Sequence, residues 1–174
     1  MEDVLQQGTR RRLYETVREH PGLSARELQR RLRLGWGETA YHLDQLTTAG
    51  AVRRERGGHQ DYYFSPELTL EDRRILLTLR SPTERKLLLQ IATEPGLTFP
   101  ELGVRAGLSK STVSFHLRRL LDLGLIEGHA GETGRRYQVP NGERVVHLVR
   151  LYQESFRDRL VDHFVDTFAA LFRE

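Results

Sequence analysis

The sequence predicts a mainly α-helical protein that contains two copies of one small domain, each ending in a β-hairpin, and a long helix after the second copy. Residues 21–66 align with residues 95–140 without a gap, at a constant offset of 74 residues. Within each copy, apolar residues at helical spacing give way to two short strands around a glycine turn. A repeat of this length is typical of a small independent domain and too long for a solenoid unit.

The two copies share residue types that shape a fold: turn-forming Pro and Gly, periodic Leu, and a Tyr in the last strand. The identical pairs are Pro21/Pro95, Gly22/Gly96, Leu23/Leu97, Glu27/Glu101, Leu28/Leu102, Arg31/Arg105, Leu34/Leu108, His42/His116, Leu43/Leu117, Leu46/Leu120, Gly50/Gly124, Gly57/Gly131 and Tyr63/Tyr137.

The first domain is expected over residues 9–66. Its first helix ends at Pro21-Gly22, and Ser24 with Glu27 forms a capping box that starts the second helix. In the third helix, we expect Ala40, Leu43 and Leu46 to face inward. The predicted helices are 9–20, 24–33 and 38–49, and the predicted strands are 51–56 and 61–64.

The second domain is expected over residues 81–140 and repeats this order. Ser81 with Glu84, and Thr98 with Glu101, are predicted capping boxes that start its first two helices. Ser109 opens the third helix. Its inward stripe is predicted to be Val113, Leu117, Leu120 and Leu121, and its strands 125–127 and 135–139.

A linker helix is predicted over residues 67–80, with Leu70, Ile75, Leu76 and Leu79 packed against the repeats. Residues 141–174 predict an amphipathic helix from about 143 to 173, roughly 45 Å long. We expect this helix to form a homodimer interface; the alternative is packing against the linker helix. The stripe that would form the interface is Leu148, Tyr152, Phe156, Leu160, Phe164, Phe168 and Leu171.

Composition excludes several classes of protein. The chain has no cysteine, which excludes disulfides, thiolate catalysis and Cys-ligated metals. No nucleophile–base pair or phosphate-binding loop is visible, so the sequence favours a protein that is not an enzyme, has no cofactor and has no evident small-molecule ligand. No signal peptide and no membrane span are visible, so we expect a cytoplasmic, nucleoid-associated protein. Each repeat carries a net charge of +2, whereas the tail carries −1.

The order helix, helix, turn, helix, hairpin is that of a winged helix, which indicates nucleic-acid binding. Residues 106–117, Leu120 and residues 123–126 resemble the recognition-helix segment of winged helix-turn-helix regulators of the ArsR and MarR superfamily. The fused pair with its C-terminal helix resembles tandem winged-helix regulators common among archaea. The resemblance covers most of residues 9–140 and implies a transcriptional regulator that binds double-stranded DNA.

Residues that contact DNA should lie near the start of the third helix, opposite its apolar stripe. The small hydroxyls can contact phosphates or base edges, and arginines later in the helix or in the hairpin can reach the backbone. In the second copy these residues are Lys110, Ser111, Thr112, Ser114, Phe115, Arg118, Arg119, Arg135 and Arg136.

The first copy departs from this pattern. Glu38 would repel phosphates, and Trp36 either stacks on a sugar or packs against the protein. The hairpin is more basic than that of the second copy, so this copy either binds backbone without reading bases or acts as a scaffold. Its candidate residues are Trp36, Thr39, Tyr41, Gln45, Arg53, Arg54 and Arg56.

Three further alternatives stay open. His42 and His116 occupy equivalent places, where a structural or phosphate contact is favoured over a metal. Carboxylates and a histidine on the tail (Asp158, Asp162, His163, Asp166) are favoured as a solvated face over a metal site. A protein–protein scaffold or a chromatin-like architectural protein would also use winged helices.

Overall fold

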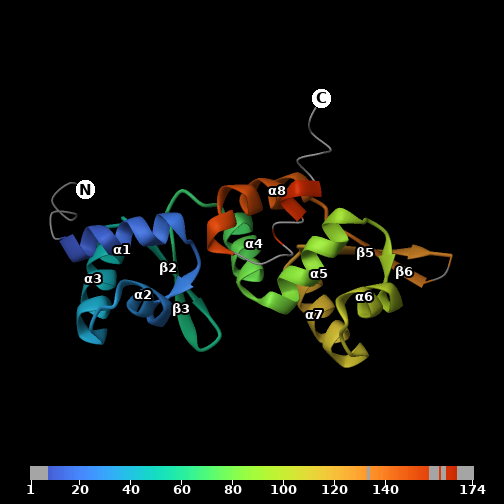
Figure 1. The fold of residues 1–174 in the computed structure, drawn as a ribbon, viewed down its shortest axis with the longest axis horizontal. Coiled ribbons are helices and arrows are strands. Elements are labelled where there is room, and N and C mark those ends of the chain that lie inside the picture. The colour runs from blue at the N-terminus through green and yellow to red at the C-terminus, as the bar shows by residue number, and fades with distance from the viewer. Residues whose placement is uncertain (1–7, 133, 157–160, 162–163, 168–174) are drawn as a thin grey trace. The chain divides into compact units, whose positions relative to one another are not determined.

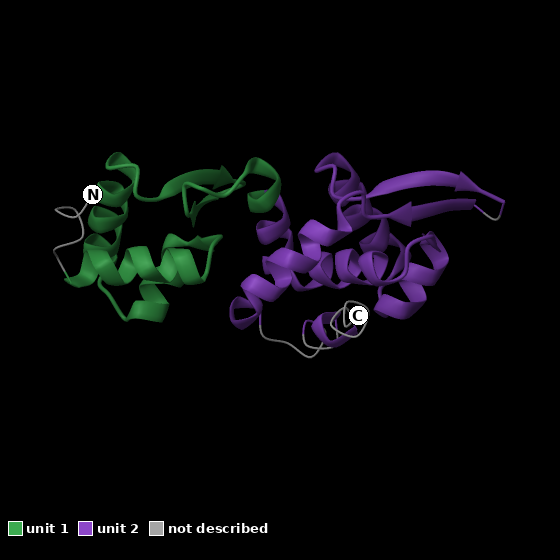
Figure 2. Ribbon diagram, turned by 90° about the horizontal axis from the view of Figure 1, so that it is seen from above, with its two compact units in different colours: residues 1–73 green, residues 74–174 purple. Residues whose placement is uncertain are grey.

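The computed structural model describes residues 8–132, 134–156, 161 and 164–167. The chain divides into two compact units, Met1–Arg73 and Arg74–Glu174 (Figure 2). None of the described helices is long and apolar enough to cross a membrane.

The two units contain the same elements in the same order (Figure 1). Every element of the second set begins and ends 74 residues after its counterpart, which confirms the tandem fold class. Unit 1 contains α1 (Gly8–Glu19), β1 (Leu23–Ser24), α2 (Ala25–Leu32), α3 (Trp36–Thr48), β2 (Arg53–Gly57) and β3 (Gln60–Phe64). Unit 2 contains α5 (Pro82–Thr93), β4 (Leu97–Thr98), α6 (Phe99–Ala106), α7 (Lys110–Asp122), β5 (Glu127–Gly131) and β6 (Gly134–Gln138).

Each hairpin is completed by a third strand that the sequence pattern did not predict. The strand order is β1-β3-β2 in unit 1 and β4-β6-β5 in unit 2, and all pairs are antiparallel. Leu23 pairs with Tyr63, and Leu97 pairs with Tyr137 in the same register. Strands of two residues are too short to give an alternation signal, and here they continue directly into a helix.

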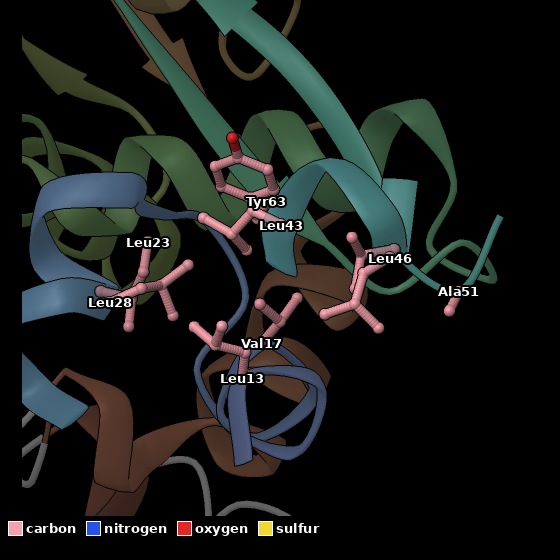
Figure 3. Close-up of a cluster of buried hydrophobic side chains, with 9 residues drawn as sticks. Leu13, Val17, Leu23, Leu28, Leu43, Leu46, Ala51 and Tyr63 are labelled. Atoms are coloured by element: carbon pink, nitrogen blue, oxygen red, sulfur yellow. The ribbon is translucent and has the colours of Figure 1, made fainter. Parts of the chain in front are cut away.

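The core of unit 1 forms where the three helices meet the sheet (Figure 3). Leu13 and Val17 come from α1, Leu28 from α2, and Leu43 and Leu46 from α3; all five are almost fully buried. Burying each such side chain contributes about 1.5–3 kcal/mol. The corresponding residues of unit 2, Leu87, Ile91, Leu102, Leu117 and Leu120, are buried as well.

The inward face of α3 differs from the prediction by one residue. Ala40 is exposed, whereas Thr39 is fully buried and its hydroxyl donates to the Gly35 carbonyl oxygen at 2.8 Å. Thr39 occupies the place of Val113, which is also fully buried. Because its hydroxyl is satisfied one turn back, Thr39 can occupy a core position, and the prediction that it faces DNA was wrong.

Two of the three predicted capping boxes are confirmed. The Glu27 carboxylate accepts from the Ser24 backbone at 2.8 Å, and the Glu101 carboxylate accepts from the Thr98 backbone at 2.7 Å. The hydrogen bond from the Thr98 hydroxyl is the main cause that lowers the pKa of the Glu101 carboxyl. The box predicted at Ser81 was wrong: its side chain makes no capping hydrogen bond, and Pro82 alone marks the start of α5.

The linker segment forms α4 (Leu70–Arg80), and Thr69 and Asp72 cap its start by reciprocal hydrogen bonds of 3.0 and 3.1 Å. Ile75, Leu76 and Leu79 are buried as predicted, but Leu70, at the first position of the helix, is 50% exposed.

The long C-terminal helix is interrupted. Helix α8 (Gly142–Leu151) ends at Tyr152, and a short 3-10 helix, η2 (Gln153–Ser155), follows. The Arg80 side chain donates to the Ser155 carbonyl oxygen at 3.2 Å and lies 4.8 Å from the centre of the Phe156 ring. Because α8 ends at Leu151 and a 3-10 helix leads to the buried Phe156, the prediction of one continuous helix from 143 to 173 was wrong.

The predicted interface stripe is largely internal where it is described. Leu148, Phe156 and Phe164 are 0%, 3% and 2% exposed within the single chain, and Tyr152 is half-buried. Leu160, Phe168 and Leu171 lie outside the described residues. For the three buried members, the structure therefore favours packing within the chain.

Candidate nucleic-acid interface

Helix α7 starts with a cluster of hydroxyl groups. Ser109 is the N-cap and accepts a hydrogen bond from the Thr112 backbone at 3.2 Å. Its hydroxyl also lies 3.0 Å from the Ser111 hydroxyl and 2.8 Å from the Thr112 hydroxyl. Thr112 is thus half-buried in the cap, and Ser111 remains exposed.

Helix α7 divides cleanly into a buried and an exposed face. Val113, Leu117 and Leu120 are buried against the core of unit 2. The opposite face brings together six of the seven residues predicted from the sequence, all exposed: Lys110, Ser111, Ser114, Phe115, Arg118 and Arg119. This face combines three positive charges, two hydroxyl groups and one aromatic ring.

A buried carboxylate beneath α7 orders part of this face. Glu84 on α5 is 2% exposed, and its Oε1 lies 3.2 Å from both His116 Nδ1 and Arg119 Nε. The His116 ring in turn meets the Phe115 ring edge-on, with centroids 5.1 Å apart and planes at 85°. Sequence analysis assigned Glu84 to a helix cap and missed this role. The residue at the same place in the first copy is Arg10. This difference between the copies was the only hint in the sequence that Glu84 has a role specific to unit 2.

We expect Glu84→Gln to lower the free energy of unfolding by about 1–2 kcal/mol, since it weakens hydrogen bonds to a buried charged acceptor. Urea unfolding of both variants measures the change. The matched control is Glu94→Gln, which removes an exposed carboxylate paired with Arg105 and should change stability by less than about 0.5 kcal/mol. Equal losses in the two variants would contradict the role assigned to Glu84.

In the hairpin of unit 2, two arginine side chains pass close to glycine residues. Arg135 and Arg136 on β6 are both exposed, and Arg136 donates to the Gly96 carbonyl oxygen at 2.9 Å. A Cβ at Gly131 would lie 2.9 Å from Arg136 Nε, and a Cβ at Gly128 would lie 2.9 Å from Arg135 Cζ. These glycines therefore leave room for the arginine side chains to cross the hairpin.

The corresponding face of α3 in unit 1 has different chemistry. Trp36 and Tyr41 are 53% and 56% exposed, and Gln45 is half-buried. Trp36 stands at the place of Lys110, and Asp44 at the place of Arg118, so α3 contains neither Lys nor Arg. The exposed face of α3 is therefore aromatic and acidic, whereas that of α7 is basic.

Three of the arginines of unit 1 lie on the hairpin strand β2. Arg53, Arg54 and Arg56 on β2 are exposed, and Arg56 lies 3.7 Å from Asp61. A groove of about 890 Å³ between α2, α3 and the hairpin is lined by residues that include Trp36, Arg54 and Arg56. Burial raises the pKa of the Tyr63 phenol at this groove, and the charge of Asp61 raises it further.

Both histidines contact the aromatic residue that precedes them. His42 is buried and meets the Tyr41 ring edge-on at 5.2 Å, as His116 meets Phe115. Across the residues that the structure describes, no group of three or more His, Cys, Asp or Glu side chains could hold a metal ion. Asp158, Asp162 and His163 lie outside those residues.

Comparison with known proteins agrees with this geometry. A family model described as an N-terminal HTH domain matches residues 7–76, and one described as winged helix-turn-helix DNA-binding matches residues 80–127. The winged helix-turn-helix model matches unit 2, and unit 1 has the same elements in the same order, so both units have this fold. The chain is accordingly a tandem winged helix-turn-helix protein, as its sequence predicts.

One curated relative and one solved structure match parts of the chain. An uncharacterized HTH-type transcriptional regulator of Methanocaldococcus jannaschii is 26% identical over 135 residues, which cover 78% of this chain and 34% of the relative. The chain thus spans about a third of the length of that relative. The crystal structure of a MarR family transcription regulator matches at 24% identity and a TM-score of 0.39, covering 59% of this chain and 76% of that one.

Proposed function

We propose that the protein is a transcriptional regulator that binds double-stranded DNA, with α7 of unit 2 lying in the major groove. The observation that carries this proposal is the exposed face of α7, which gathers Lys110, Arg118 and Arg119 opposite a buried apolar stripe. An α-helix fits the major groove, where each base pair presents a distinct pattern of donors and acceptors. The winged helix-turn-helix match over residues 80–127 supports the same conclusion.

Each part of the interface has a distinct task. Ser111 and Ser114, in the first half of α7, are placed to contact base edges or phosphates. The free N–H groups at the start of the helix favour a phosphate. Arg118 and Arg119 follow later in the helix and reach the backbone, while Arg135 and Arg136 contact the flanking backbone or the minor groove from the hairpin.

Unit 1 binds the DNA backbone without reading bases in this proposal. Three of its arginines, Arg53, Arg54 and Arg56, are exposed on the hairpin, and its α3 face carries Asp44 in place of an arginine. The exposed Trp36 and Tyr41 rings favour a second candidate for this unit, namely a contact with another protein.

The proposal also includes a homodimer that forms through the tail. Leu148, Phe156 and Phe164 are already buried within the chain, so a dimer interface would need other surfaces.

A titration of the purified protein with DNA tests the proposal. We expect salt-dependent binding to a duplex from the region upstream of its own coding sequence, at least ~10³-fold tighter than to a scrambled duplex at physiological salt. Equal affinity for the two duplexes would favour an architectural role. Absence of binding at low salt would contradict the proposal and favour the scaffold alternative.

A further inference from the structure

The Phe115 ring is the one large apolar group on the exposed face of α7. It is 64% exposed and lies one turn after Ser111, beside Ser114 and Arg118. Burying a phenylalanine side chain contributes about 1.5–3 kcal/mol, so an exposed ring in this position leaves stabilisation unused in the free protein. An apolar partner in the bound state would recover it.

The Phe115 ring also packs against one neighbouring ring. His116 contacts it edge-on at 5.1 Å, and the Nδ1 of His116 lies 3.2 Å from the buried Glu84 carboxylate. Unit 1 repeats the arrangement with Tyr41 and His42, at centroids 5.2 Å apart. A side chain that is fixed before binding loses less conformational entropy when it makes a contact.

The major groove offers one prominent apolar group to such a ring, the C5-methyl of thymine. Phe115 is the sixth residue of α7, within the part of the helix whose side chains approach base edges. We propose that Phe115 reads a thymine methyl group and is a specificity-determining residue of unit 2. This inference rests on the proposed function, because it requires α7 to lie in the major groove.

The experiment removes the methyl group and the ring separately and together. The upstream duplex is amplified once with thymidine and once with deoxyuridine triphosphate, which deletes every C5-methyl group and preserves base pairing. Wild type and Phe115→Ala are titrated with both duplexes. Val104→Ala is the matched control, because Val104 is an apolar residue that is 83% exposed on α6 and not on α7.

For wild type and Val104→Ala, we expect about fourfold weaker binding to the uracil duplex for each methyl contacted. Phe115→Ala should bind both duplexes equally, at the affinity of wild type for the uracil duplex, because ring and methyl are two sides of one contact. Thermal unfolding by circular dichroism verifies that the Phe115→Ala variant is folded.

Two outcomes would overturn the inference while leaving the proposed function intact. Wild type could bind both duplexes equally, or Phe115→Ala could distinguish them as strongly as wild type does. Failure of wild type to bind either duplex at low salt would instead overturn the proposed function itself.

Discussion

Replacing Lys110 and Arg118 together by alanine should weaken DNA binding about tenfold or more at physiological salt. Both side chains are exposed on the same face of α7 and carry charges that would neutralise phosphates or contact bases. Each lost phosphate contact reduces the slope of log K against log salt concentration by about 0.9. If both residues contact the backbone, the slope should therefore fall by roughly 2, and the loss should be similar for all sequences.

Fluorescence titrations at several salt concentrations measure the affinity and the slope together. Arg150→Ala is the control, since Arg150 is equally exposed but lies on α8, away from α7. The result that would sink the assignment of α7 is an unchanged slope in the double variant, or an equal loss in the Arg150 variant. A stability measurement excludes unfolding, which is not expected because both side chains lie outside the core.

The fold was largely predictable because the signals were local and occurred twice. Pro21-Gly22 and Pro95-Gly96 end equivalent helices, and the boxes at Ser24 and Thr98 start the next ones. The structure repeats the elements at the same offset of 74 residues that the sequence shows. The short strands β1 and β4 escaped prediction, since two residues give no periodicity and their pairing with β3 and β6 is long-range.

The exposed residues of the candidate site could be predicted from the sequence, but the contacts among them could not. Spacing on α7 gave the right exposed face, because helical periodicity alone separates Val113, Leu117 and Leu120 from Lys110 and Arg118. Thr39 was misassigned as an exposed residue, although its alignment with the apolar Val113 already favoured the core. The buried contacts of Glu84 could not be predicted from the sequence, because they depend on how α5 packs against α7.

The packing of the tail could not be predicted from the sequence pattern either. An apolar stripe predicts that a helix face is covered, but it does not say by which surface. Helix α8 ends at Leu151, the Arg80 side chain donates to the Ser155 carbonyl oxygen, and Leu148 and Phe156 are buried within the chain.

We expect Leu148→Ala to lower the free energy of unfolding by about 2–5 kcal/mol, which is the usual cost of a cavity left by a fully buried leucine. Leu148 is 0% exposed in the single chain. The matched control is Leu151→Ala on the same helix: Leu151 is 61% exposed, and its truncation should change stability by less than about 0.5 kcal/mol.

Protein concentration distinguishes the two possible origins of this effect. A side chain covered by its own chain stabilises each protomer, so any dependence of the unfolding midpoint on protein concentration over a hundredfold range should be the same in wild type and Leu148→Ala. A side chain covered by a second copy would couple unfolding to dissociation, and the midpoint of wild type would rise with concentration more steeply than that of Leu148→Ala. Urea unfolding at low and high protein concentration, with mass measured by light scattering, separates these cases. If the wild-type midpoint depends on protein concentration and that of Leu148→Ala does not, Leu148 lies in a dimer interface, as the sequence alone predicts.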